Sequence, residues 1–229
     1  MPGTHTDREF DAELSSLRER LVMMAARVEE MIVRSVRALV DGDVELARTT
    51  VLLDRAVNQD EIDVDEQVLR ILARWQPMAS DLRLVITATR MVTDLERIGD
   101  LAVNVCERVQ DLVATGGGTS LYGVPILAER VGHMVRGAVD AFVQGDADAA
   151  QEVLSWDDEV DRVFHELFDD VLARLVAGTA APERALPVLN SAKYLERMGD
   201  HATNLAEQVI FLVRGREVRH LGRRVRGNE

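Results

Sequence analysis

The 229-residue sequence contains little of what secreted, membrane-spanning or β-sheet proteins depend on. Cys106 is its only cysteine, so an intrachain disulfide is excluded and nothing points to an oxidising compartment. Aromatic residues make up only 4%, so the core must be aliphatic, which favours packed helices. Residues 1–10 lack the layout of a secretory signal, and no stretch approaches the roughly 20 apolar residues of a membrane span. We therefore expect a cytoplasmic protein.

The sequence also lacks the positive charge of a nucleic-acid-binding protein. Its net charge is −13, yet residues 214–229 hold six arginines and two glutamates, a local charge of +4 that leaves −17 for the rest. This acidity argues against direct contact with nucleic acid and is explained either by solubility or by cation binding. The basic residues 216–229 are expected either to contact an acidic partner or lipid headgroups, or to form a solvated end.

Enzyme signatures are missing as well. The sequence has no Gly-rich phosphate-binding loop and no Gly-x-Ser-x-Gly motif. A ferritin-like metalloenzyme would need Glu-x-x-His on two helices, but the match Glu217-x-x-His220 occurs only once. We predict that the chain is not an enzyme. The alternatives are a bundle metalloprotein or metalloenzyme with a multinuclear centre, and a purely structural bundle.

The sequence does contain an internal duplication. Residues 96–104 (Glu-Arg-Ile-Gly-Asp-Leu-Ala-Val-Asn) return as 196–204 (Glu-Arg-Met-Gly-Asp-His-Ala-Thr-Asn), 100 residues later. Two upstream segments return 103 residues later, Val40–Asp43 as Val143–Asp146 and Asp54–Asn58 as Asp157–Asp161. Three matches in one order indicate two copies of one unit, with three extra residues in the first copy around residues 75–83.

Turn residues divide each copy into three predicted helices, and no alternating pattern of strand length interrupts them. In the first copy we expect helices at residues 11–40, 43–75 and 80–115, with Asp43 capping the second and Ser80 or Asp81 capping the third. In the second copy they are expected at 125–143, 146–177 and 182–214. The predicted fold is all-α, two tandem three-helix bundles placed end to end or side by side. The expected domains are a first repeat at 1–115, a linker at 116–124, a second repeat at 125–215 and a basic tail at 216–229.

Helical periodicity places several oxygen-bearing side chains beside the apolar faces of these helices. In the second helix Asp54, Asn58, Glu61 and Asp65 align with apolar residues, as Asp157 and Asp161 do in the fifth. In the third helix Glu96, Asp100 and Asn104 follow one edge of the apolar arc, and Glu196, Asp200 and Asn204 repeat that edge in the sixth. Each unit therefore offers two polar ridges on neighbouring helices that border the core.

Partly buried carboxylates need cations or hydrogen-bond donors, and two solutions are open. Arg97 and Arg197 adjoin the motifs and could form ion pairs. Alternatively, metal ions could bridge the ridges, since oxygen ligands suit hard cations such as Mg²⁺, Mn²⁺, Ca²⁺ or iron. Gly99 and Gly199 lie inside predicted helices, where they indicate a close approach of neighbouring helices beside the acidic edge. The candidate metal ligands are Asp54, Asn58, Glu61, Glu96, Asp100, Asn104, Asp157, Asp161, Glu196, Asp200 and Asn204.

The doubled Glu-Arg-x-Gly-Asp-x-Ala-x-Asn motif resembles the signature of the PhoU family of phosphate-uptake regulators. Residues 76–83 (Gln-Pro-x-Ala-x-Asp-Leu-Arg) and the ending at 211–220 also resemble that family, so the resemblance covers roughly residues 10–222. It implies two three-helix bundles with divalent or trivalent metal ions, such as Fe, Mn, Mg or Zn, at acidic motifs. Glu96 with Asp100 and Glu196 with Asp200 match the motifs, faced by Asp54 with Asn58 and Asp157 with Asp161. Asn58 departs from the carboxylate pattern, so the first site is expected to be weaker or to use Glu61.

The resemblance also implies a cytoplasmic homodimer that acts as a negative regulator of phosphate uptake and, indirectly, of transcription of the phosphate regulon. Its expected partners are the ATPase of a phosphate ABC transporter and a sensor histidine kinase, with membrane association only through such partners. Phosphate signalling rests on the resemblance, because neither composition nor spacing points to it.

Overall fold

The structure is a computed structural model that describes residues 3–116 and 123–218. Six α-helices and no β-strand are found in this part of the chain, which confirms the all-helical prediction. The helices are α1 (Gly3–Asp41), α2 (Val44–Trp75), α3 (Ala79–Ala114), α4 (Val124–Gln144), α5 (Ala147–Val176) and α6 (Pro182–Arg214). Most of the linker predicted at 116–124 and of the tail predicted at 216–229 lies outside the described residues.

Equivalent turns join the first two helices of each repeat. Gly42 and Gly145 adopt φ values of +65° and +64°, a backbone conformation that glycine reaches without steric cost. The next residue in each copy caps the following helix, as the sequence predicts for Asp43. The Asp43 carboxylate accepts from Leu46 N at 2.8 Å, and Asp146 accepts from the backbone of residues 148 and 149.

Two helix starts differ from the predictions. Helix α1 begins at Gly3 rather than at the predicted Asp11. The sequence does not reveal this earlier start, because the residues before Asp11 are mostly polar and show no helical apolar pattern. Phe10 packs against Trp75 with ring centroids 5.6 Å apart, so tertiary contact extends past the predicted start. Helix α3 is not capped by Ser80 or Asp81. Its N-cap is Met78, which makes no side-chain cap bond, and Asp81 already lies in the first turn, where a carboxylate favours the helix dipole.

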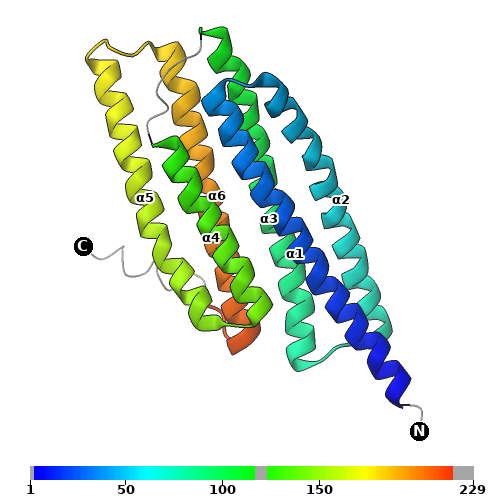
Figure 1. Ribbon diagram of the computed structural model, residues 1–229. Coiled ribbons are helices and arrows are strands. Elements are labelled where there is room, and N and C mark those ends of the chain that lie inside the picture. The colour runs from blue at the N-terminus through cyan, green and yellow to red at the C-terminus, as the bar shows by residue number, and fades with distance from the viewer. Residues whose placement is uncertain (1–2, 117–122, 219–229) are drawn as a thin grey trace.

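The two three-helix bundles lie side by side, α1–α3 in one and α4–α6 in the other (Figure 1). Helix α3 packs antiparallel to α6. Arg83 near the start of α3 donates to Leu212 O near the end of α6, while Arg184 near the start of α6 donates to Thr115 O after α3. Helix α1 packs against α4, where Arg136 pairs with Glu29 at 3.0 Å. The repeats therefore face each other through equivalent helices.

One cluster of buried apolar side chains runs through both repeats. It is built mainly from Leu, Val, Ile, Ala and Met, as the low aromatic content predicts, with Phe142 the largest fully buried side chain. Cys106 is buried in this core, and burial raises the pKa of its thiol to about 12, so it is a packing residue. None of the described helices has the length and apolar content needed to cross a bilayer.

Candidate metal centres

The first acidic site lies where α2 and α3 approach closely. A Cβ atom on Gly99 would stand 3.3 Å from Val57 Cγ1 and 3.9 Å from Asp54 Oδ1, so the glycine allows the two helices to meet beside the Asp54 carboxylate. This is the close approach that the sequence predicts for Gly99. This close approach brings the oxygen-bearing side chains of α2 near those of α3.

Electrostatic interactions show which side chains of the first site lie near one another. Burial raises the pKa of Asp54, and the Asp100 carboxylate raises it further. Burial, then Asp100 and Glu61, raise the pKa of Glu96. Burial raises the pKa of Glu61, and the Asp65 and Asp100 carboxylates raise it further. Carboxylates from both helices thus repel one another at partly buried positions, and positive charge placed among them would be stabilised.

The first site contains few groups that offset this repulsion. Asn58 Nδ2 donates to Asp54 Oδ2 at 2.9 Å, but Asp54 Oδ1 and Asn58 Oδ1 are buried without a hydrogen-bond partner. Arg97 stands 3.6 Å from Glu96 and 3.7 Å from Asp100, and it is 59% exposed. These contacts are long and solvated, so Arg97 compensates the carboxylates only weakly. Buried oxygen atoms without donors are costly, and a cation would satisfy them.

The second site repeats this construction between α5 and α6. A Cβ atom on Gly199 would stand 3.3 Å from Val160 Cγ1, the same separation as at Gly99. Burial raises the pKa of Asp200, and the neighbouring Glu196 and Asp161 carboxylates raise it further. Predicted ligands on the two helices therefore lie near one another here as well. Asp157 is half-buried on α5, one turn before Asp161.

A lysine gives the second site more compensation than the first. Lys193 Nζ stands 2.7 Å from Glu196 Oε2. The same oxygen is buried and accepts no hydrogen bond, so the contact is an ion pair whose orientation does not suit hydrogen bonding. Ion pairing therefore contributes to both sites, as the sequence allows, although Lys193 does so instead of Arg197.

The Asn204 side chain makes its hydrogen bond outside the second acidic site. Its Nδ2 donates to Asp94 Oδ1 on α3 at 3.0 Å, and His201 Nδ1 lies 2.9 Å from the same oxygen. Asn104 is half-buried on α3. The contact of Asp94 with Asn204 and His201 joins the two repeats. The sequence does not mark it, because the position equivalent to Asp94 is Tyr194 and the position equivalent to His201 is Leu101.

The predicted ligands do not form a ready-made coordination shell. Among residues 3–116 and 123–218, no group of three His, Cys, Asp or Glu side chains is arranged to hold a metal ion. The carboxylates are instead spread along the two ridges of each site. Their donor chemistry fits a hard cation, since all of them present oxygen and three buried oxygens lack hydrogen bonds. A bound ion would require these side chains to turn toward one another.

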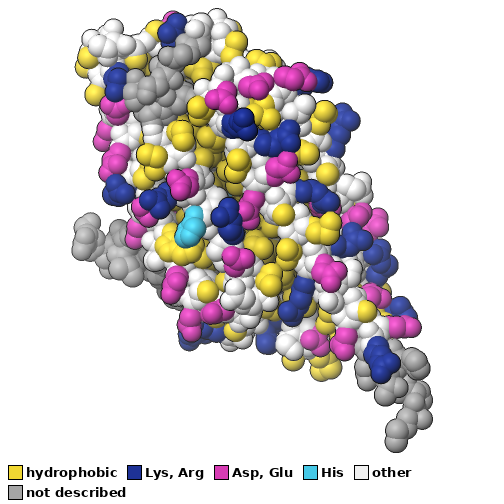
Figure 2. Space-filling model, in the orientation of Figure 1, with side chains coloured by type: hydrophobic (Ala, Val, Ile, Leu, Met, Phe, Trp, Pro, Cys, Tyr) yellow, Lys and Arg dark blue, Asp and Glu magenta, His cyan; other side chains and the backbone are white. Residues whose placement is uncertain are grey.

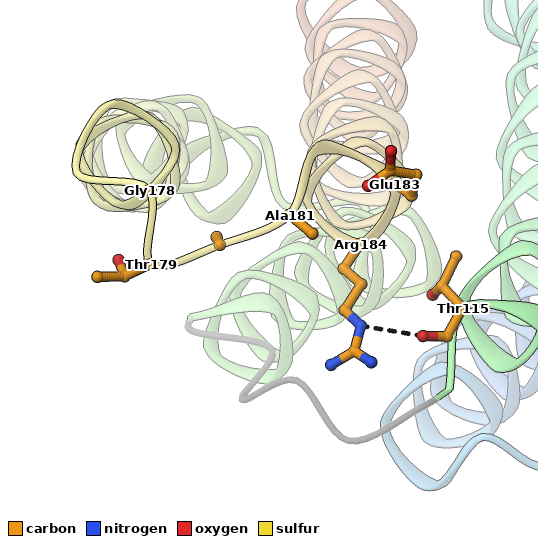
Figure 3. A pocket seen from close by; sticks show the side chains of 7 residues that line it. Thr115, Gly178, Thr179, Ala181, Glu183 and Arg184 are labelled. Atoms are coloured by element: carbon orange, nitrogen blue, oxygen red, sulfur yellow. Dashed lines mark hydrogen bonds between the residues drawn. The ribbon is translucent and has the colours of Figure 1, made fainter.

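A hollow at one end of the second repeat holds none of the predicted ligands (Figure 3). It is lined by Thr115, Gly178, Thr179, Ala180, Ala181, Glu183 and Arg184. Arg184 Nε donates to Thr115 O at 3.0 Å across this hollow, so the arginine is engaged in joining α6 to the end of α3. On the face shown in Figure 2, acidic and basic side chains are interspersed, and no purely acidic patch is visible.

Comparison with known proteins gives consistent matches along most of the chain. The sequence model of the PhoU domain matches residues 21–109 and 124–209. The phosphate-specific transport system accessory protein PhoU homolog of Pseudomonas aeruginosa is 42% identical over 219 residues, covering 95% of this chain and 90% of that protein. The PhoU accessory protein of Escherichia coli K12 is 30% identical over 218 residues, covering 95% and 90%.

Two solved structures share the fold. The crystal structure of PhoU from Pseudomonas aeruginosa superposes with a TM-score of 0.86 at 41% identity, covering 90% of this chain and all of that chain. The phosphate transport system regulatory protein PhoU from Streptococcus pneumoniae superposes with a TM-score of 0.84 at 25% identity, covering 91% and 99%. Both halves of this chain therefore lie within the matched region.

Proposed function

Because this chain belongs to the PhoU domain family, we propose that it is a negative regulator of phosphate uptake and of phosphate-regulon signalling. The family is one of regulatory accessory proteins of phosphate transport, so the prediction that the chain is not an enzyme is confirmed. The observation that carries the proposal is the 42% identity to a transport accessory protein over 95% of the chain.

The regulation that we propose acts through protein contacts. The partners are the ATPase of a phosphate ABC transporter and a sensor histidine kinase, and the protein links the state of the first to the activity of the second. It would act in the cytoplasm as a homodimer, reach the membrane only through the transporter, and affect transcription indirectly. Long helices support such a role, because they present extended surfaces to a partner.

We further propose that the two acidic sites hold hard metal ions. In the first site Asp54, Asn58, Glu61, Glu96 and Asp100 would be the ligands, and in the second Asp157, Asp161, Glu196 and Asp200. The support is the burial and the mutual repulsion that raise the pKa values of Asp54, Glu96 and Asp200, together with the buried oxygens that accept no hydrogen bond. A bound ion would supply the positive charge that Arg97 and Lys193 provide only in part.

The regulatory proposal is tested by deleting the gene in its native host. Radioactive phosphate uptake and the activity of a phosphate-regulon reporter would be measured in phosphate-rich medium. We expect both to rise in the deletion strain and to return to the parental level when the full chain is expressed again. Unchanged uptake and reporter activity would overturn the proposal.

The basic residues 216–229 call for a separate measurement. If they contact an acidic partner, a chain ending at Gly215 should bind the purified transporter or kinase more weakly than the full chain. Surface plasmon resonance at two salt concentrations would measure this, because charge-based binding weakens as salt rises. Unchanged affinity would show that this segment is a solvated end.

A further inference from the structure

The outer edge of the second repeat carries an exposed apolar strip next to the acidic site. We define this α5–α6 strip as Phe164, Phe168, Leu172, Val176, Leu186 and Leu189. Phe168 is 40% exposed, Leu172 45%, Val176 82% and Leu186 55%. Phe164 and Leu189 are partly buried and pack against the core, so they form its base. Single exposed apolar residues are ordinary, but a continuous apolar strip marks a docking surface.

The register of the two helices shows that these residues are neighbours. Gly199 packs against Val160, and Lys193 Nζ lies 5.4 Å from the Phe164 ring centroid. Because α5 and α6 run antiparallel, continuing this register brings Leu172 opposite Leu186. Leu186 precedes Lys193 by seven residues, nearly two helical turns, and therefore lies on the same edge of α6. Phe164 to Val176 spans twelve residues, about 18 Å of helix.

The first repeat keeps the equivalent exposed pair. Leu69 corresponds to Leu172 and Ile86 corresponds to Leu186, with exposures of 66% and 37%. Gly99 packs against Val57 in the equivalent register, which places Leu69 opposite Ile86 near the turn between α2 and α3. An apolar pair that stays exposed at the same place in both copies indicates a use outside the core. The second copy adds Phe164 and Phe168.

Carboxylates border the α5–α6 strip on both helices and at both ends. The acidic site with Asp161, Glu196 and Asp200 adjoins one end of the strip. Asp169 flanks it on α5, and Glu183 lies at the other end, at the start of α6. The two basic side chains beside the strip are already paired, Arg174 with Asp170 at 2.9 Å and Lys193 with Glu196 at 2.7 Å. An anionic membrane surface and a second strip with the same acidic border would both be repelled.

We propose that the α5–α6 strip binds an amphipathic helix of a partner protein that carries apolar side chains on one face and Lys or Arg residues beside them. Three turns of such a helix would match the length of the strip, with apolar residues at i, i+3, i+4 and i+7 against Phe168, Leu172 and Leu186. Its basic residues would face the acidic site and Asp169. The proposal uses the proposed function only in taking the protein to act by binding partners.

The test uses defined peptides and the full chain after treatment with a chelator. The probe is a labelled 18-residue helical peptide of Leu and Lys with leucine at the stated spacing. Its controls are a scrambled peptide of equal composition and a Leu/Glu peptide of equal pattern. Fluorescence anisotropy would compare wild type with Leu172→Glu/Leu186→Glu, and with Leu52→Glu, which changes an apolar side chain of similar exposure on α2.

We expect the patterned Leu/Lys peptide to bind wild type and the Leu52→Glu variant equally, and at least tenfold more weakly to the double variant. The scrambled and Leu/Glu peptides should also bind at least tenfold more weakly. Circular dichroism would establish that the variants are folded, which we expect because the replaced side chains are exposed. Equal binding of patterned and scrambled peptides, or equal loss in Leu52→Glu, would overturn the proposal.

Two further outcomes would assign the strip to another occupant and overturn the proposal. One is wild-type binding to phosphatidylglycerol vesicles that the double variant loses. The other is a change of oligomeric state in the double variant by analytical ultracentrifugation. Neither peptide nor vesicle binding depends on phosphate regulation, so this proposal can fail while the regulatory proposal stands, and the reverse also holds.

Discussion

The two acidic sites are built on the same helix contact but have different surroundings. A Cβ atom on Gly99 or Gly199 would stand 3.3 Å from a valine of the facing helix, and Glu-x-x-x-Asp recurs beside each glycine. On the facing helix, however, Glu61 and Asp65 of the first repeat correspond to Phe164 and Phe168 of the second. The first site therefore continues as an acidic ridge, whereas the second gives way to an apolar strip. The two copies thus share the helix contact and differ in the side chains that flank it.

The largest expected difference between the two repeats is the loss of metal from one site when its own carboxylates are removed. Glu96→Ala/Asp100→Ala should abolish metal binding at the first site and leave the second, and Glu196→Ala/Asp200→Ala should do the reverse. Elemental analysis of protein purified without chelator, then reconstituted with manganese or iron, would measure this. Glu61→Ala by itself should weaken metal binding at the first site and leave the second unchanged. Absence of metal in reconstituted wild type would contradict the prediction and leave the ridges as ion-paired elements.

The glycines should show where the repeats are alike. Leucine at position 99 or 199 would push against Val57 or Val160, whose Cγ1 atoms already lie 3.3 Å from a built Cβ. We expect each substitution to lower the free energy of unfolding by about 1–3 kcal/mol through overpacking. Urea unfolding would measure it, with Gly132→Leu as control because no atom lies within 4 Å of its Cβ position. A loss in only one repeat would break the equivalence of the contacts.

Charge neutralisation should affect the two repeats in opposite directions. Burial, Asp100 and Glu61 raise the pKa of Glu96, so the folded protein binds a proton at the Glu96 carboxyl more tightly than the unfolded chain does. That stability is present at low pH and is lost as pH rises above the ordinary value of 4.5. Without metal, Glu96→Gln should therefore raise the melting temperature at pH 7 by about 2 °C and leave it unchanged at pH 3.

The equivalent Glu196→Gln should not stabilise the protein, because it removes the partner of Lys193. Differential scanning calorimetry at both pH values would compare the two variants. A rise of equal size in both would show that Lys193 does not compensate Glu196, and the proposed difference between the sites would then be wrong.

The smallest effect is expected from the basic side chains themselves. Arg97→Ala and Lys193→Ala should each cost less than about 1 kcal/mol, since both side chains are largely exposed. Lys193→Ala should cost the more of the two, because Lys193 stands closer to its carboxylate and also lies over the Phe164 ring. Chemical denaturation of chelator-treated protein would rank them, and the reverse order would contradict this view of the second site.

Features that depend on neighbours within one repeat could be predicted from the sequence. Turn residues at Gly42 and Gly145 marked the hairpins, and Asp43 was recognised as a cap because its chemistry is local. The doubled motif placed Glu96 with Asp100 on the edge that meets α2. The start of α3 is predicted to within one residue, but its cap is wrong, because the turn uses Ala79 at φ +50°, a conformation that alanine rarely adopts.

Contacts between the repeats could not be predicted in the same way. The sequence does not decide whether the bundles lie end to end or side by side, because periodicity describes one helix at a time. The pairing of Asn204 with Asp94 depends on the antiparallel packing of α3 on α6, whereas helical periodicity alone groups Asn204 with the acidic ridge. The division into domains at 1–115 and 125–215 stays a prediction about folding units.

Because Asp94 of the first repeat contacts His201 and Asn204 of the second, neither repeat could replace the other without changing this contact. In a chain of two first repeats, Asp94 of each copy would face Leu101 and Asn104 of the other, so each carboxylate would keep one potential donor instead of two. In a chain of two second repeats, Tyr194 would replace Asp94, and His201 would lose the carboxylate that it now contacts. The full contact of this aspartate therefore requires two different halves, and a chain built from two identical halves would lose part or all of it.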